Sequence, residues 1–222
     1  IEEQNKTPAY PCVLLAAGAG LRMKGGAKLL LPLGGETVLA RAARAAIEHC
    51  DPLVVVTGKD GDLVRESLKR SGLSRGKLIF AHNPRWMEGR VGSLRAGVAA
   101  LGNNQEGFFL AHADMPFVDP GVYKALAEAA AARKTAQLPP ALLFPSIKGK
   151  KGHPVFFPFS FLPFLLAVRE AESLKETVSK LEQAWVETAC DGILEDIDKP
   201  EDYERLLRKY GLAEGPSPKG TA

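Results

Sequence analysis

The chain has 222 residues, of which 45% are hydrophobic and 25% charged, an ordinary composition for a globular protein. Its net charge of +3 gives no electrostatic reason to expect a nucleic-acid or membrane-surface partner. No apolar run reaches the roughly 20 residues of a membrane-spanning helix, and the first residues do not have the pattern of a signal peptide. The three cysteines are widely spaced without a CxxC pair, so we expect reduced thiols in a cytoplasmic protein.

Short apolar runs alternate with amphipathic segments through the first 133 residues. The runs carry almost no charge, as buried parallel strands do, and cover residues 12–17, 53–57, 78–81 and 108–112. The segments between and after them place apolar residues on one face or are rich in alanine, which predicts helices at residues 37–49, 62–71, 91–101 and 122–133. This alternation predicts parallel strands joined by crossover helices, an α/β fold in three layers.

The remainder of the chain is less regular. We expect strands at residues 141–144, 154–157 and 185–188, and helices at residues 159–168 and 173–181. A last helix is expected to begin at Pro200, a residue suited to a first helical turn, and to stop at Gly211. Residues 8–212 are therefore expected to form a single domain, followed by a flexible tail at residues 213–222.

A glycine-rich loop follows the first expected strand and reaches Lys28. In α/β sheets, ligands bind outside the carboxyl ends of the strands, where small residues let backbone N–H groups approach phosphate oxygens. Arg22 and Lys28 add positive charge. The loop is not a Walker loop, because Ala27 and Leu29 flank the lysine, and Met23 takes the third glycine position of a dinucleotide fingerprint. On its residues alone, it is either an anion-binding loop or a strand-end loop with incidental charge.

Five sequence blocks in a fixed order carry a family resemblance. They are Leu-Ala-Ala-Gly-Ala-Gly-Leu-Arg-Met with Lys-Leu-Leu-Leu-Pro-Leu-Gly-Gly (15–35), Asn-Pro-Arg-Trp-Met-Glu-Gly with Gly-Ser-Leu-Arg-Ala-Gly (83–97), Ala-Asp-Met-Pro-Phe-Val (113–118), Gly-His-Pro-Val (152–155) and Asp-Ile-Asp-Lys-Pro-Glu-Asp-Tyr (196–203). Together they resemble the MobA-like NTP transferases, most nearly the molybdenum cofactor cytidylyltransferase branch. The resemblance implies a Rossmann-like, mostly parallel mixed sheet and transfer of a nucleotidyl group with release of pyrophosphate.

The resemblance also implies roles for individual residues. The residues expected to contact the nucleotide or its acceptor are Leu15, Ala16, Ala17, Gly18, Gly20, Arg22, Lys28, Gly92, Ser93 and His153. Of these, Arg22 and Lys28 would hold the triphosphate and act in catalysis together with Asp114. Ser93 would help to read the base. Mg²⁺ would bind Asp114, with Asp198 completing the metal site.

Several of these residues have a structural alternative. Asp114 is otherwise a turn residue, and Asp198 can equally cap the last helix. Asp196 lies on the same face of an extended segment as Asp198 and is the other candidate for the second metal ligand. His153 follows a basic, glycine-rich loop that suits an anionic substrate or forms a solvated hairpin turn. Asp119 is expected to be the N-cap of the helix that follows it.

The sequence indicates the nucleotide donor more clearly than the acceptor. CTP is the expected donor, with GTP as the alternative, and the expected acceptor is the phosphate of molybdopterin, a monoester that needs no general base because its second pKa is about 6. The family's Gly-Asp-x-Gly-Ala-Arg block is replaced by residues 170–182, which leaves two alternatives: a sugar or alditol phosphate as acceptor, or a non-catalytic nucleotide-binding regulator. A molybdoenzyme or its chaperone is the expected protein partner.

Overall fold

Strands from both halves of the chain form one mixed sheet. The structure, a computed structural model, describes residues 7–18, 27–73, 78–102, 105–168 and 174–212. In this part of the chain the strand order is β10-β7-β9-β6-β1-β4-β5, with β8 beside β7. The strands are β1 (Tyr10–Ala16), β4 (Cys50–Thr57), β5 (Leu78–His82), β6 (Gly107–His112), β7 (Leu142–Ile147), β8 (Lys150–Lys151), β9 (Val155–Pro158) and β10 (Gln183–Glu187). Only β8 and β9 pair antiparallel with their neighbours in this described sheet, so the predicted mostly parallel sheet is confirmed.

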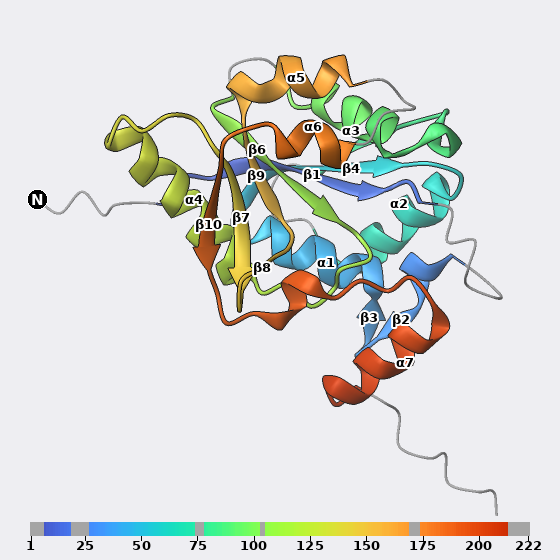
Figure 1. The fold of residues 1–222 in the computed structure, drawn as a ribbon. Coiled ribbons are helices and arrows are strands. Elements are labelled where there is room, and N and C mark those ends of the chain that lie inside the picture. The colour runs from blue at the N-terminus through green and yellow to red at the C-terminus, as the bar shows by residue number, and fades with distance from the viewer. Residues whose placement is uncertain (1–6, 19–26, 74–77, 103–104, 169–173, 213–222) are drawn as a thin grey trace, which may run out of the picture.

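Helices cover both faces of the sheet and complete the three layers (Figure 1). They are α1 (Val38–Ile47), α2 (Gly61–Arg70), α3 (Arg90–Ala99), α4 (Pro120–Thr135), α5 (Leu162–Ala167), α6 (Leu174–Ser179) and α7 (Pro200–Lys209). Leu14 belongs to a buried cluster with residues of α1, α2, α4 and α7, whereas Val13 belongs to a second cluster with residues of α3 and α5. The two clusters lie on opposite faces because successive side chains of a strand point in opposite directions. The Rossmann-like architecture is thereby confirmed.

Two helices, α4 and α7, begin at the positions that the sequence predicts. The Asp119 carboxylate accepts a hydrogen bond from the Gly121 N–H at 2.7 Å and caps α4, as predicted. Pro200 is the first residue of α7, also as predicted, but Asp198 does not cap this helix. The N-cap position is taken by Lys199, and the Asp202 carboxylate accepts its N–H at 2.9 Å. The capping alternative for Asp198 is therefore wrong.

The shortest strands and helices differ from the prediction. Strands β2 (Pro32–Leu33) and β3 (Glu36–Thr37) form a small hairpin around two glycines with φ of 61° and 87°, the left-handed conformation that a tight two-residue turn requires. The expected helix at residues 159–168 is divided into η3 (Phe159–Phe161) and α5, which begins beside Pro163. A proline cannot donate the backbone hydrogen bond of a helix interior, so it favours a first turn at this point.

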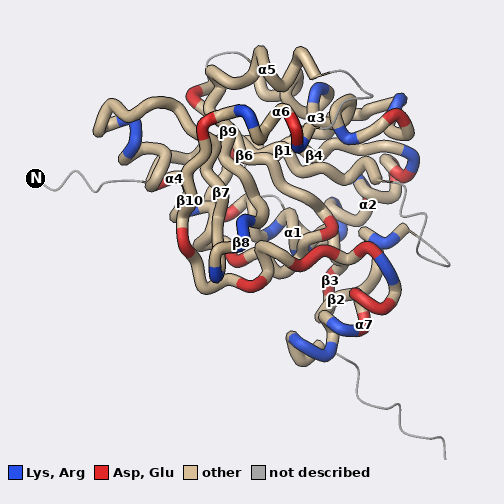
Figure 2. The backbone as a smooth tube through the Cα atoms, viewed as in Figure 1, with Lys and Arg blue, Asp and Glu red and all other residues tan. Residues whose placement is uncertain are grey.

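The parallel strands bring their carboxyl ends to one edge of the sheet. Strands β1, β4, β5 and β6 run the same way, and β7 joins them because both β6 and β7 are antiparallel to β9. Lys and Arg, Asp and Glu are concentrated on the helices and connecting segments, whereas the central strands carry almost none (Figure 2). Charged side chains that converge at the carboxyl edge therefore come from the segments that follow the strands.

Candidate active site

The glycine-rich loop leaves the sheet at the end of β1. There the Leu15 carbonyl accepts a hydrogen bond from the Ala113 N–H at 3.0 Å, which ties the end of β1 to the segment after β6. Gly18, two residues beyond β1, has no heavy atom of the described residues within 4 Å of the position that a Cβ would take. The described part of the site thus leaves space beside the Gly18 backbone. Gly20 and Arg22, expected to contact the nucleotide, lie outside the described residues.

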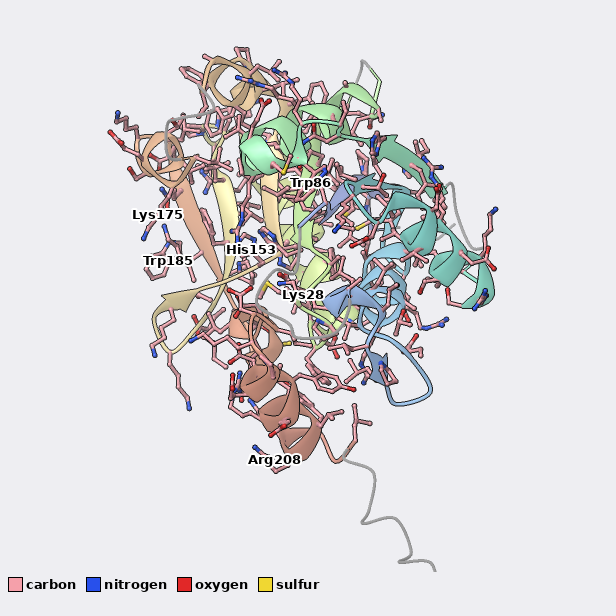
Figure 3. The ribbon with its side chains drawn as sticks, turned by 90° about the vertical axis from the view of Figure 1, so that its right-hand side faces the viewer. Lys28, Trp86, His153, Lys175, Trp185 and Arg208 are labelled. Atoms are coloured by element: carbon pink, nitrogen blue, oxygen red, sulfur yellow. The ribbon has the colours of Figure 1, made fainter. Side chains whose placement is uncertain are left out.

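Three predicted site residues meet in one ionic cluster. Lys28, in the short helix η1 (Lys28–Leu30), places its Nζ 2.6 Å from Asp114 Oδ2 and 3.0 Å from Asp198 Oδ1. Asp114 follows β6 and Asp198 precedes α7, so residues far apart in the sequence converge here. The lysine side chain is 10% exposed, against 19% for Asp114 and 37% for Asp198. The cluster, which lies at the carboxyl edge of the sheet (Figure 3), therefore meets solvent through its carboxylates.

Main-chain hydrogen bonds hold this cluster together. The Ile197 N–H donates to the carbonyl of Asp114 at 3.0 Å, which fixes the segment bearing Asp198 against the turn after β6. Earlier in the same segment, the Ile193 carbonyl accepts a hydrogen bond from the His153 N–H at 3.0 Å. The segment before α7 is therefore anchored at both of its ends to the predicted site.

The electrostatics of the cluster favour an additional cation. Burial acts to lower the pKa of Lys28, but the charge of Asp114 and the hydrogen bonds to both carboxylates outweigh it, and the pKa is raised. Burial, together with the charges of Asp198 and Asp114, raises the pKa of the Asp196 carboxyl. Among the described residues, three carboxylates thus lie around the ammonium of Lys28, and negative charge is concentrated where Asp196 joins Asp114 and Asp198.

The donor set of this cluster fits a hard divalent cation. Carboxylate oxygens suit Mg²⁺, which typically binds one or two carboxylates together with water and substrate phosphates. The Lys28 ammonium lies between Asp114 and Asp198 and stands in for such a cation in this structure. Within the described residues, no group of three or more His, Cys, Asp or Glu side chains is arranged to hold a metal. A divalent ion here would accordingly need the phosphates of a substrate to complete its ligands.

The predicted base-reading residue is engaged inside the protein. Ser93, in the first turn of α3, is buried, and its Oγ accepts a hydrogen bond from Asn83 Nδ2 at 3.0 Å. The Asn83 N–H in turn donates to the Thr57 carbonyl at 2.9 Å. Ser93 and Asn83 therefore join the ends of β4 and β5 to α3. Next to them, Trp86 lies within 3 Å of the position that a Cβ of Gly58 would take, so the indole closes over the end of β4.

Two histidines pack against each other beside the ionic cluster. The rings of His112 and His153 are 4.3 Å apart in an edge-to-face arrangement. Burial, followed by the charge of Arg90, lowers the pKa of His112 to about 4. Burial, followed by His112 and Arg90, lowers the pKa of His153 to about 3. Both rings are consequently neutral at pH 7.

Two hollows of the surface differ in the residues that line them. A cavity of about 500 Å³ is lined by both histidines and by Leu15, and so adjoins the Lys28 cluster. A larger groove of about 890 Å³ lies between α1, α4 and Tyr210, which follows α7, and none of the described residues predicted for the site is among those that line it. The smaller cavity is therefore the one associated with the predicted chemistry.

The structure thus places the predicted residues in two neighbouring groups. Lys28, Asp114 and Asp198 are in direct contact, whereas His153 and Leu15 line the adjoining cavity. Of the three cations of that cavity, Lys151 belongs to the basic loop that the sequence already suggested for an anionic substrate, whereas Arg90 and Lys175 were missed. An arginine in a first helical turn and a lysine on a helix resemble ordinary surface residues, so the sequence contains no local signal for these two.

The chain matches known proteins over most of its length. The family model described as the MobA-like NTP transferase domain matches residues 12–185. The molybdenum cofactor cytidylyltransferase of Escherichia coli (strain K12) is 26% identical over 203 residues, 91% of this chain and 97% of the relative. The nicotine blue oxidoreductase of Paenarthrobacter nicotinovorans is 27% identical over 206 residues, 90% of this chain and 97% of the relative.

A solved structure shares the fold. That of Rv0371c from Mycobacterium tuberculosis H37Rv, in complex with manganese, superimposes with a TM-score of 0.67 at 22% identity and covers 90% of this chain and 99% of that chain. No helix of the described residues has the length and apolar character to cross a membrane. Because the family model covers most of the sequence and the expected fold is present, the chain belongs to the MobA-like NTP transferase family.

Proposed function

We propose that the protein transfers a nucleotidyl group, CMP in preference to GMP, from an NTP to a phosphate monoester and releases pyrophosphate. Molybdopterin is the first candidate for the acceptor. The observation that carries this proposal is the cluster of Lys28, Asp114 and Asp198 at the edge of the sheet where β1 ends and the glycine-rich loop begins. A cation and two carboxylates at the carboxyl edge of a parallel sheet are suited to binding a nucleoside triphosphate with its metal ion.

The relatives support the nucleotide and the metal to different extents. The E. coli relative is named a molybdenum cofactor cytidylyltransferase and aligns over 97% of its length, which favours CTP and molybdopterin. The Rv0371c structure is a complex with manganese, which supports a divalent ion as the metal for this chain. We propose Mg²⁺ for this chain, held by Asp114 and Asp198, where it would neutralise charge on the phosphates.

The remaining chemistry requires alignment rather than acid–base catalysis. An oxygen of the acceptor phosphate attacks the α-phosphorus, and the bond from that phosphorus to the bridging oxygen of the β-phosphate breaks. The acceptor is already dianionic at neutral pH, so it needs no proton removal. Lys28, whose pKa is raised by Asp114 and Asp198 against the effect of burial, remains charged and would stabilise the departing pyrophosphate.

One relative bears the name of an oxidoreductase, so membership of the family does not by itself fix the reaction. The ionic cluster favours nucleotidyl transfer, because a lysine between two carboxylates suits phosphate and a divalent ion. Two further candidates compete with transfer to molybdopterin: transfer to a sugar or alditol phosphate, and a nucleotide-binding role without catalysis.

The test is release of pyrophosphate from CTP or GTP with Mg²⁺ and molybdopterin. We expect turnover with CTP, and a loss of roughly 100-fold or more in Lys28→Met, because its cation faces the phosphates. Lys124→Met, which changes an exposed lysine on α4, is the matched control and should retain full turnover. No release with molybdopterin or any sugar or alditol phosphate, despite tight CTP binding, would instead support the non-catalytic role.

A further inference from the structure

The cavity beside the two histidines is built from elements of both halves of the chain. It lies at the ends of β1, β6 and β9, between the first turn of α3 and α6. Its volume of about 500 Å³ is within the range of small-molecule sites. Its described lining includes Val91, Phe144, His153 and Val178, together with three cations.

The charges of these lining residues all have one sign. Arg90, Lys151 and Lys175 are exposed cations, and no Asp or Glu is among the described residues that line the cavity. Lys151 places its ammonium 4.6 Å from the centre of the Phe144 ring and donates to Gln183 Oε1 at 2.9 Å, so its described partners leave its charge uncompensated. Such a wall attracts an anion.

Apart from these cations, the wall is mostly apolar. The described lining contains no Asn, Gln, Asp or Glu side chain, and Ser179 provides its hydroxyl group. A polyhydroxylated sugar needs many hydrogen-bond partners when it leaves water, because a buried hydroxyl without a partner is destabilising. The surface formed by Val91, Phe144 and Val178 suits an apolar body instead.

One polar atom in the wall lacks a partner. Nδ1 of His153 is buried and has no hydrogen-bond partner among the described residues. Burial, followed by the charges of His112 and Arg90, lowers the pKa of His153, so the ring is neutral at pH 7 and offers one donor and one acceptor nitrogen. A ligand in the cavity is a suitable partner for this nitrogen. In Figure 3, His153 lies between Lys28 on one side and Lys175 on the other.

We infer that this cavity binds the acceptor of the proposed transfer, and that the acceptor is a phosphate monoester on an apolar, ring-bearing body rather than a sugar or alditol phosphate. This inference rests on the proposed function. Helix α6, from the segment that departs from the family's sequence pattern, contributes Lys175 and Val178 and selects the acceptor. The cavity's charge recruits the phosphate, and its apolar wall receives the body.

Calorimetric titration of the full chain tests the inference without turnover. We expect 1-naphthyl phosphate to bind at least about tenfold more tightly than glucose 1-phosphate. Lys175→Glu should weaken binding of 1-naphthyl phosphate about tenfold, because it reverses a charge at the cavity. Lys180→Glu is the matched control: Lys180 is an exposed lysine just beyond α6 that does not line the cavity, and we expect less than a twofold change.

A second variant protects the test against a folding defect. Val178→Asn places an amide in the apolar wall, and it should weaken binding of 1-naphthyl phosphate without weakening that of glucose 1-phosphate. The inference is overturned if glucose 1-phosphate binds as tightly, if neither compound binds, or if the Lys175 and Lys180 variants lose equal affinity. Titration with CTP and Mg²⁺, together with pyrophosphate release, reports separately on the proposed function, which can fail while the selectivity of the cavity stands.

Discussion

At the scale of single residues, Lys28 organises the site through its two carboxylate partners. Its ammonium contacts Asp114 at 2.6 Å and Asp198 at 3.0 Å, so each carboxylate is already oriented before a nucleotide arrives. Removing one partner of a buried pair costs more than the pair contributes, because the other charge is left without compensation. Substitutions that keep the volume of the side chain are therefore the appropriate probes.

Asp114→Asn is expected to lower activity strongly while leaving the protein folded. The amide retains the shape of Asp114, while Lys28 keeps its contact with Asp198, so the melting temperature should change by only a few degrees. Pyrophosphate release should fall roughly 100-fold or more, because the carboxylate proposed to hold the metal is lost. Asp119→Asn is the matched control, since asparagine caps a helix as well as aspartate does. Equal activity of the two variants would contradict the role of Asp114.

The pH dependence of stability should report on the half-buried pair of His112 and His153. His112 has an ordinary pKa of 6.5 that burial and Arg90 lower to about 4. Between these values the unfolded chain binds a proton that the folded chain does not, so the free energy of unfolding falls as pH drops from 6.5 towards 4. His112→Gln should remove this part of the decline. Urea unfolding at pH 7 and pH 5 measures this fall in the free energy of unfolding, with His49→Gln as the control. If the free energy of unfolding falls equally in the wild type and in His112→Gln, the pH dependence does not come from His112.

At the scale of elements, the segment before α7 depends on a glycine that allows close backbone contact. A Cβ at Gly192 would lie 1.9 Å from the carbonyl oxygen of Phe117, which is backbone and cannot rotate away. We expect Gly192→Ala to shift the segment that bears Asp198, and to lower the free energy of unfolding by about 1–3 kcal/mol together with activity. Chemical unfolding and pyrophosphate release measure both effects.

Gly61→Ala is the control for this glycine. Its Cβ would approach the Thr57 side chain at 3.2 Å, so the neighbour needs to move only slightly, and alanine favours the helix that begins there. We expect its stability and activity to remain close to those of the wild type. Wild-type activity in Gly192→Ala would show that the position of the segment is not critical to the site.

Some helices, strands and site contacts could be predicted from the sequence, and others could not. The apolar runs of β1, β4, β5 and β6 were predictable because a buried parallel strand carries little charge on either face. Hairpin β2–β3 was missed, since strands of two residues have no periodicity. The contact of Lys28 with Asp198 joins residues 170 positions apart, so no spacing rule contains it. Only the convergence of strand ends and the family blocks predicted that these residues share a site.

At the scale of the whole molecule, one edge of the sheet combines two environments. Around Lys28 the described carboxylates suit a metal–nucleotide complex, whereas the cavity under α6 presents cations and apolar side chains. The first environment contains residues that the sequence blocks predicted. The second depends on α6 and on strand β8, and Lys175 of α6 serves the cavity only through the tertiary fold.

Ligand binding to the folded molecule should raise its thermal stability in a pattern that identifies the second metal ligand. A ligand at 100 times its dissociation constant stabilises the folded state by about 2.7 kcal/mol, or roughly 5–10 °C for a chain of this length. We expect CTP with Mg²⁺ or Mn²⁺ to produce such a shift, and EDTA to abolish most of it. Asp198→Asn should lose the metal-dependent part, because Asp198 already shares a cation with Asp114.

Asp196→Asn is the matched comparison for this ligand assignment. Burial and the charges of Asp198 and Asp114 raise the pKa of Asp196, so its protonated form is favoured by folding, and ionisation at neutral pH destabilises the folded state. Asp196→Asn should therefore melt slightly above the wild type at pH 7, lose that advantage near pH 3, and keep the metal-dependent shift. If Asp196→Asn loses the shift and Asp198→Asn retains it, the second ligand is Asp196, and the Lys28–Asp198 contact orders the site without holding the metal.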